Sequence, residues 1–275
     1  MNQDSLQYSF PRYLSAKKSV DDRALNRHVW NSLAGALPGS SAESPLRALE
    51  IGAGIGTMLE RMLEWELLEH ASYTALDALP ENIATSRERL PTWAKEQGYQ
   101  ATQTGENQFS IQGQARSVKL DFQVGDLFDF IVANDRRQQG PRRWDLHIAH
   151  AFLDLMDIPA TLPQLFNLLR PGGLFYFTIN FDGATLFEPT IDPVFDDLIQ
   201  ALYHRTMDER ITDGKPSGDS QAGRHLFKHI RDAGGQILDA GASDWVVFPT
   251  KQGYPYDEAY FLHFIIQTLH QALRC

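Results

Sequence analysis

The sequence is poor in cysteine and lacks the segments of an exported or membrane-bound protein. Its one cysteine, Cys275, is the last of 275 residues, so no intrachain disulfide and no cysteine-based metal site can form. No apolar run approaches the roughly 20 residues that cross a bilayer, and the start lacks the basic and then apolar pattern of a signal peptide. No cluster of metal ligands stands out. These absences predict a cytoplasmic protein with no membrane partner and no bound metal.

Positive charge is also scarce. Lys and Arg number 25 against 35 Asp and Glu, which gives a net charge of -10. A negative chain opposes the general attraction on which binders of nucleic acids rely. The basic segment 136–143 contains no aromatic side chain that could stack on a base, so it resembles a solvated loop. We therefore expect a small-molecule partner and no nucleic acid.

Short apolar segments alternate with amphipathic segments from residue 46 onward, which predicts a mainly parallel sheet with helices on both faces. The expected strands are Leu46–Ile51, Tyr73–Asp77, Val118–Gln123, Trp144–His150, Leu174–Asn180 and Gln236–Ala240, with Asp244–Thr250 as a further candidate. The expected helices are Thr57–Leu67, one that opens at Pro80, Pro163–Leu169, Asp192–Met207 and Glu258–Leu273. Pro171-Gly172-Gly173 predicts a turn before the fifth strand.

The chain is expected to form one domain, residues 1–275. Residues 1–44 form a helical N-terminal cap, residues 45–250 the core and residues 251–275 a C-terminal helix. Residues 99–117 contain two weakly alternating runs that predict a hairpin beside the third strand. The long insertion 181–222 predicts a lid.

The most informative segment carries an apolar strand into three glycines and then a helix. Gly52, Gly54 and Gly56 allow the backbone to approach a nucleotide-like ligand. A dinucleotide fingerprint started at Gly52 requires glycine at position 57, where this chain has Thr57. Glu50, two residues before the first glycine, would repel a pyrophosphate and attract an ammonium group. A ligand with a cationic amino-acid group is therefore favoured over a dinucleotide.

With these residues, the sequence resembles the class I S-adenosylmethionine-dependent methyltransferases over roughly residues 46–250. The resemblance implies an α/β fold with a Rossmann-like sheet, helices on both faces, the N-terminal cap and a lid inserted after strand five. It implies S-adenosyl-L-methionine as cofactor, bound by Glu50, Gly52, Ala53, Gly54, Gly56, Asp77, Ala78, Asp126 and Leu127. Asp77 would bind the ribose hydroxyls and Asp126 the adenine amino group. Either aspartate can instead cap a helix, although their place at the ends of successive strands favours a ligand.

The N-terminal segment resembles the helical cap that closes over the cofactor in many small-molecule methyltransferases. Tyr13, Lys17 and Arg23 in this segment are candidates to reach the methionine carboxylate. A solvated helix surface explains the same residues.

Methyl transfer from a sulfonium requires alignment and exclusion of water, and a base only where the nucleophile carries a proton. His150, at the end of the fourth strand, is the first candidate for that base. Its ring can instead pack beneath the adenosine or cap a turn. Asp154 is a weaker candidate, because an aspartate there can simply start a helix. The substrate candidates are Asn180, Asp182, His204 and Arg210, although an exposed charged helix accounts equally well for those in the lid.

The segment Ala149-His150-Ala151-Phe152 differs from the Asn/Asp-Pro-Pro-Tyr/Phe motif of enzymes that methylate nucleobases or glutamine. We therefore predict methyl transfer to an oxygen or nitrogen of a small metabolite. A non-catalytic binder of the cofactor, acting as a partner subunit or sensor, is the alternative, followed by an NAD(P)-dependent oxidoreductase. The apolar face of the C-terminal helix is available for a partner, and a homodimer is one arrangement left open.

Overall fold

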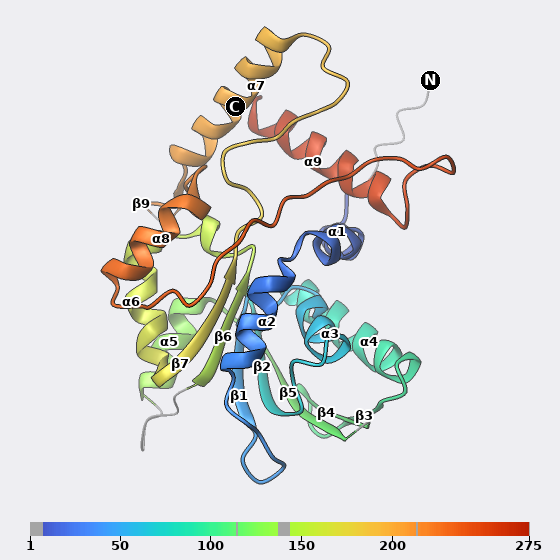
Figure 1. Cartoon of the computed structure of the whole chain (residues 1–275), viewed down its shortest axis with the longest axis vertical. Coiled ribbons are helices and arrows are strands. Elements are labelled where there is room, and N and C mark those ends of the chain that lie inside the picture. Colours follow the sequence, from blue (N-terminus) through green and yellow to red (C-terminus); the bar gives the residue numbers. More distant parts are fainter. Residues whose placement is uncertain (1–7, 114, 137–143, 213, 275) are drawn as a thin grey trace.

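The computed structural model describes residues 8–113, 115–136, 144–212 and 214–274 (Figure 1). The basic segment 136–143, apart from Arg136, and the terminal Cys275 lie outside these residues. The interpretations of that loop and of the single cysteine therefore stay predictions.

A seven-stranded sheet lies at the centre of the molecule, with the strand order β3-β4-β5-β2-β1-β6-β7. Its strands are β1 (Leu46–Ile51), β2 (His70–Asp77), β3 (Gln100–Gln103), β4 (Gln108–Gly113), β5 (Arg116–Val124), β6 (Trp144–His150) and β7 (Leu169–Thr178). Strands β5, β2, β1, β6 and β7 run parallel to one another, and the β3–β4 hairpin adds an antiparallel edge beside β5. The winding direction reverses between β1 and β6, so a ligand crevice is expected at the carboxyl ends of these strands. The predicted α/β fold with a Rossmann-like, mainly parallel sheet is confirmed.

Helices cover both faces of the sheet (Figure 1). The helices are α1 (Phe10–Ala24), α2 (Arg27–Ala36), α3 (Thr57–Glu64), α4 (Pro80–Glu96), α5 (Leu127–Arg136), α6 (Ile158–Leu168), α7 (Pro193–Asp208), α8 (Ala222–Asp232) and α9 (Glu258–Ala272), with a short 3-10 turn, η1 (Leu153–Leu155). One buried cluster joins α2, α3 and α4 to the sheet, and a second joins α5, α6 and α8 to its other face. The short strands β8 (Ile211–Thr212) and β9 (Lys215–Pro216) form a separate hairpin after α7.

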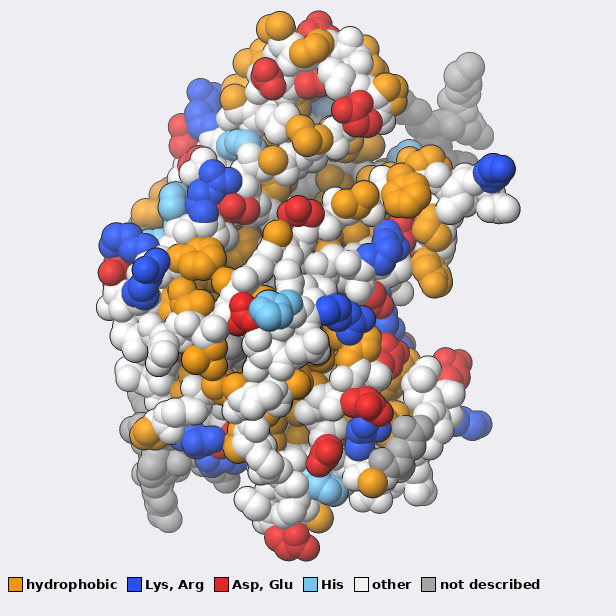
Figure 2. All heavy atoms as spheres, in the orientation of Figure 1, with side chains coloured by type: hydrophobic (Ala, Val, Ile, Leu, Met, Phe, Trp, Pro, Cys, Tyr) orange, Lys and Arg blue, Asp and Glu red, His pale blue; other side chains and the backbone are white. Residues whose placement is uncertain are grey.

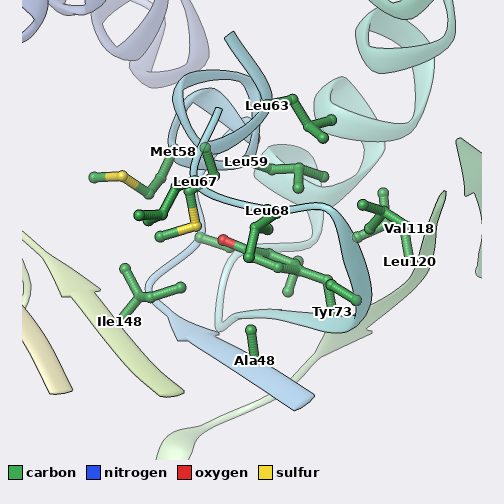
Figure 3. Packing of buried hydrophobic residues seen from close by; sticks show 14 of the residues in the cluster. Ala48, Met58, Leu59, Leu63, Leu67, Leu68, Tyr73, Val118, Leu120 and Ile148 are labelled. Carbon is green, nitrogen blue, oxygen red and sulfur yellow. The ribbon is translucent and has the colours of Figure 1, made fainter. Parts of the chain in front are cut away.

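The first face of the sheet is packed around Tyr73, whose side chain lies below α3 (Figure 3). Ala48 and Ile148 of the neighbouring strands and Leu59 and Leu68 surround it in the same cluster. Alternate residues of a strand point to opposite faces of the sheet. Because helices cover both faces, apolar side chains are buried on both. This packing fixes β1 and β2, whose ends carry the glycine turn and Asp77.

Several sequence predictions are confirmed. Strands β1 and β6 have the predicted bounds, β2 and β5 contain the predicted segments, and β3 and β4 form the predicted hairpin. The start of α4 at Pro80 is also correct, and α7 and α9 agree with prediction to within a residue at each end. The turn predicted at Pro171-Gly172-Gly173 is wrong, because β7 begins at Leu169 and passes through these residues with a register shift against β6.

Two predicted strands are wrong. Gln236–Ala240 and Asp244–Thr250 belong to an irregular extended segment, residues 234–257, which we call the strap. The strap runs from α8 to α9 (Figure 1). Among the described residues, no strand pairs with the outer edge of β7.

The strap is held by side chains of α1 and of the α1–α2 turn. Asn26 donates to the main-chain oxygen of Ala242 at 3.0 Å, and the Trp245 indole donates to Asp21 at 3.0 Å. These contacts hold the strap against α1 and the α1–α2 turn. The strap therefore does not pair with the edge strand β7.

The C-terminal helix packs on the N-terminal one. Arg23 of α1 donates to both carboxylate oxygens of Glu258 at 2.6 and 2.9 Å. The Tyr13 ring stacks on Phe261 and Phe264, with centroids 5.8 and 4.1 Å away. The apolar face of the C-terminal helix, which we expected to be available for a partner, is therefore largely covered by this chain's own α1.

A buried histidine in β6 makes the stability of the fold depend on pH. His147 is 0% exposed, and neither ring nitrogen has a hydrogen-bond partner among the described residues. Burial lowers the pKa of His147 from its ordinary 6.5 to about 3. Between these values the unfolded chain binds a proton that the folded chain does not, so this group destabilises the fold as pH falls.

We therefore expect His147→Leu to remove an acid-sensitive contribution to stability. By this linkage, wild type loses about 2 kcal/mol at pH 5 through His147 alone, relative to pH 7.5 or above. Urea denaturation at pH 5 and pH 7.5 measures the loss in both proteins, and the loss should be smaller in the variant by about that amount. Equal losses would show that His147 is protonated as easily in the folded state as in the unfolded state.

Candidate functional site

A hollow of roughly 2440 Å³ opens at the carboxyl ends of β1, β2, β6 and β7, where the winding reversal predicts a ligand crevice. The glycine turn, the inner side of α1, the turns after β6 and β7 and the strap line it. A typical small-molecule pocket occupies about 300–1,000 Å³. The hollow therefore has room for two ligands side by side.

The glycine turn lies at one wall of the hollow. Gly52, Gly54 and Gly56 all have positive φ, at 68°, 56° and 84°. A Cβ on Gly52 would lie 2.6 Å from the Phe152 ring, and one on Gly56 would lie 2.6 Å from the Ser86 hydroxyl. Both the backbone conformation and the close packing therefore require glycine at these two positions. Ala53 and Gly54 line the hollow, whereas Gly56 caps α3.

Glu50 places a buried carboxyl beside this turn. The residue is 2% exposed, lines the hollow and accepts a hydrogen bond of 2.6 Å from the Tyr73 hydroxyl. Burial raises the pKa of Glu50 to about 8, although the Tyr73 hydrogen bond and the charge of Arg61 oppose the rise. The carboxyl gains a partner if a ligand brings an ammonium group to this wall. Sequence reasoning selected Glu50, but not the phenol that holds it.

Asp77 joins the end of β2 to the glycine turn. It accepts from the main-chain nitrogens of Gly54 and Leu79 at 2.8 and 2.9 Å and from the Asn82 amide at 3.1 Å. Asp77 and Ala78 both line the hollow. Two carboxylate oxygens offer about four acceptor positions, so one remains for a ligand hydroxyl.

Replacing Asp77 should therefore affect both stability and binding. We expect Asp77→Ala to lower the free energy of unfolding by about 1–3 kcal/mol, because it leaves buried donors unpaired. We expect at least a tenfold loss of S-adenosylhomocysteine affinity by calorimetry, because the turn loses its brace. Unchanged affinity with a folded variant would contradict a ligand-binding role for Asp77.

Asp126 and Leu127 are not brought to the hollow. Asp126 accepts from the Phe128 main-chain nitrogen at 2.7 Å at the start of α5, as a helix cap does, and it lines a smaller second hollow. Leu127 is buried in the core. Their role at the adenine stays a prediction. A loss of S-adenosylhomocysteine affinity in Asp126→Ala would support it.

His150 lines the hollow within a buried polar cluster. Its Nε2 lies 2.9 Å from Asp21, and its Nδ1 lies 2.5 Å from the Thr178 hydroxyl. Because a carboxylate only accepts, Nε2 donates to Asp21 and Nδ1 accepts from Thr178. Lys17 pairs with the same carboxylate at 3.0 Å, and Arg61 lies 3.6 Å from it. The cluster therefore joins α1 to β6, β7 and α3.

The charges of this cluster are set by burial and by Asp21. Burial lowers the pKa of His150 to about 4, and the charge of Lys17 adds to this effect. Burial also lowers the pKa of Lys17. For Asp21 burial acts to raise the pKa, but Lys17 and His150 outweigh it and hold that pKa well below its usual range. His150 is therefore neutral at pH 7, with both ring nitrogens engaged.

This geometry bears on two predicted roles. The role of His150 as a base stays a prediction, and the structure gives the ring a second role in holding α1 to the sheet. Lys17 lines the hollow but is already paired with Asp21, so a methionine carboxylate would have to compete for it. Asp21 itself was not selected, although its i, i+4 spacing from Lys17 predicts an ion pair.

Of the substrate candidates, Asn180, Asp182 and Arg210 line the hollow, whereas His204 is not among its lining residues. Asp182 is engaged by Arg224, whose Nε donates to it at 3.0 Å. The Nε2 atom of His204 is buried and has no partner in the described part of the chain.

The predicted lid projects from the sheet at α7 (Figure 1). None of the residues of α7 is buried. Apolar side chains gather over this helix and the loop before it (Figure 2); the exposed ones are Leu186, Phe187, Ile191, Val194, Phe195 and Leu198. The role of this segment as a lid stays a prediction.

The described ranges contain no metal-binding cluster and no membrane-spanning helix. No group of three or more His, Cys, Asp and Glu side chains there is placed to hold a metal ion. In the same ranges, no helix has both the length and the apolar character needed to cross a membrane.

The solved structures with a similar fold include methyltransferases and a cyclase. No protein-family model and no curated protein matches the chain. A complex of the Haloferax volcanii Trm112 methyltransferase activator with a protein described as a methyltransferase is 16% identical, with a TM-score of 0.49, and 92% of this chain covers 89% of that one.

Two further structures extend the range of activities. Haemonchus contortus phosphoethanolamine N-methyltransferase 2 with S-adenosyl-L-methionine is 14% identical, with a TM-score of 0.46, and 84% of this chain covers only 43% of it. The [4+2]-cyclase SpnF is 15% identical, with a TM-score of 0.44, and 95% of this chain covers 78% of it. At these values the matches leave the activity to be judged from the site.

Proposed function

We propose that this chain binds S-adenosyl-L-methionine at the glycine turn and transfers its methyl group to an oxygen or nitrogen of a small-molecule acceptor. The observation that carries the proposal is the buried Glu50 carboxyl, which lines the hollow beside a turn of three positive-φ glycines. An amino-acid ammonium would pair with that carboxyl. A cofactor with a ribose would offer hydroxyls to the remaining acceptor position of Asp77.

The same residues disfavour a dinucleotide. A pyrophosphate in the turn would lie beside the Asp77 carboxylate, and like charges at short range in a buried site repel strongly. The Glu50 carboxyl would offer it no positive charge. Lys17, which lines the hollow nearby, is already paired with Asp21. An NAD(P)-dependent oxidoreductase would need a donor in place of Glu50.

The acceptor would occupy the part of the hollow at the exits of β6 and β7. Polar groups from Asp154, Asn180 and Arg210 reach this part of the lining. A non-catalytic binder has no need of such groups, so their presence favours an enzyme. The protein would align the acceptor with the activated methyl group and keep water out.

Calorimetry with S-adenosylhomocysteine and with NADH tests this proposal on the full chain. We expect binding of S-adenosylhomocysteine and no measurable binding of NADH. Binding of NADH alone would refute the proposal. If S-adenosylhomocysteine binds, but S-adenosyl-L-methionine gives no methylated product with any acceptor in a metabolite panel, the non-catalytic alternative is favoured.

A further inference from the structure

Two buried polar atoms at the exits of β6 and β7 have no hydrogen-bond partner within the described residues. They are Oδ1 of Asp154 and Nδ2 of Asn180, and both residues line the hollow. Leaving a buried donor or acceptor unpaired costs about 1–3 kcal/mol. A fold keeps two such atoms at one site only at a loss of stability, so a ligand that pairs with them is indicated.

The two residues follow neighbouring strands, and both line the hollow. Asp154 lies in η1, just after β6, and Asn180 lies just after β7, its parallel neighbour in the sheet. Tyr203 of α7 lies near parts of both turns. Its ring centroid lies 6.0 Å from that of Phe181, the residue after Asn180. Burial raises the pKa of Tyr203, and the nearby Asp154 carboxylate adds to this rise.

The neighbouring cations do not pair with the Asp154 carboxylate. Lys17 forms its ion pair with Asp21. Arg210 donates to the main-chain oxygen of Asp154 at 2.8 Å and to that of Ser217. The Asp154 side chain forms no ion pair in the part of the chain that the structure describes.

The complementary ligand group both donates and accepts. An ionised carboxylate oxygen accepts only, whereas the Asn180 amide nitrogen donates only. A single hydroxyl can give its proton to Asp154 and receive a hydrogen bond from Asn180 on the same oxygen. Aromatic side chains of Phe152, Phe181 and Tyr203 also line the hollow, and aromatic walls favour an aromatic ring.

We propose that Asp154 and Asn180 bind the hydroxyl of a phenol-type methyl acceptor, with Asp154 as the base and Asn180 as the group that holds the oxygen. This inference rests on the proposed function. In the step, an O–CH3 bond forms and the S–CH3 bond of the sulfonium breaks, so the sulfur keeps the bonding pair and becomes neutral. The hydroxyl proton passes to the Asp154 carboxylate.

Burial supports the assignment of Asp154. It raises the pKa of this carboxyl above its ordinary value, and the charges of Lys17 and Arg210 moderate the rise. A phenol hydroxyl has a pKa of about 10. The smaller the difference between the two pKa values, the less free energy the proton transfer costs, so burial makes Asp154 a better base for a phenol.

Fluorine NMR on the full chain saturated with S-adenosylhomocysteine tests the site with simple probes. We expect 4-fluorophenol to bind roughly tenfold more tightly than 4-fluoroanisole, whose methylated oxygen has no proton to donate. Asp154→Ala and Asn180→Ala should each abolish most of this preference. Asp239→Asn is the matched control, because Asp239 also lines the hollow but already accepts from Ser32. It should keep the preference.

The outcomes separate this inference from the proposed function. Failure of S-adenosylhomocysteine to saturate the protein would refute the proposed function. Saturation with equal affinity for both probes in wild type, a result that requires no variant, would refute the hydroxyl site alone. A preference that survives in folded Asp154→Ala would do the same. With S-adenosyl-L-methionine instead, the fluorine signal should convert to that of 4-fluoroanisole in wild type and not in Asp154→Ala.

Discussion

Glu50→Ala is expected to weaken S-adenosylhomocysteine binding by about 100-fold or more. The substitution leaves a buried ammonium without its counter-charge, and breaking a buried ion pair costs about 3–5 kcal/mol. Calorimetry at pH 8 measures the loss. The matched probe is 5′-methylthioadenosine, which lacks the amino-acid group and should bind the variant and wild type with similar affinity. Equal losses for both compounds would mean that Glu50 shapes the turn and does not contact the ammonium.

The Glu50 carboxyl should make the binding of S-adenosylhomocysteine depend on pH. Without ligand, Glu50 has a raised pKa of about 8, whereas an ammonium partner would lower it. Affinity should therefore rise with pH up to about 8, by at most tenfold per pH unit, with release of a proton on binding. Calorimetry in two buffers of different ionisation enthalpy measures that proton. In Glu50→Gln the proton release should vanish.

Asp21→Ala is expected to cause the largest loss of stability. Removing this carboxylate leaves the buried Lys17 without its ion-pair partner, and Arg61 keeps only Asp22. The expected loss in the free energy of unfolding is about 3–5 kcal/mol, measured by urea denaturation at pH 7. The substitution also removes the carboxylate that accepts hydrogen bonds from His150 and Trp245, so α1 and the strap should loosen from the sheet.

The neighbouring Asp22 provides the control. Asp22 lies on α1 beside Asp21, and its side chain is 29% exposed. It pairs with Lys18 of α1 and with Arg61 of α3. Asp22→Ala should cost less than Asp21→Ala. In Asp21→Ala, a second substitution, Lys17→Met, should recover part of the loss, because it removes one unpaired buried cation. Equal costs for the two aspartates, with no recovery, would contradict the central role of Asp21.

The parts of the fold that follow from local pattern could be predicted from the sequence. Strands β1 and β6 are short, mostly buried segments that carry several apolar residues, and their bounds could be predicted from the local sequence. Helix starts at Pro80 and after Asp192 carry their own signals, since a proline suits the first turn and an aspartate caps it.

The parts that depend on distant contacts could not be predicted. The segment Asp244–Thr250 is rich in aromatic and β-branched residues, as a strand is, yet Trp245 donates to Asp21, 224 residues away, and the segment lies on α1 instead of β7. The residue types of a segment indicate that it suits a β-strand, but they do not identify the strand or helix on which it will pack. The Tyr73 partner of Glu50 comes from the adjacent strand in the same way.

The site shows the same division. The residue types at the glycine turn and at Asp77 were identifiable, because a tight turn needs glycine and a strand end favours a carboxylate at an open α/β sheet. The engagement of both His150 nitrogens was not, since it depends on Thr178 from β7 and Asp21 from α1 meeting in space.

A crystal structure of the full chain with S-adenosylhomocysteine tests the central claim most directly. The account predicts that the ligand's amino nitrogen lies within about 3.2 Å of a Glu50 carboxylate oxygen, while the adenosine passes the glycine turn. A ligand whose amine points into solvent, with the Glu50 carboxyl still bound only to Tyr73, would contradict it.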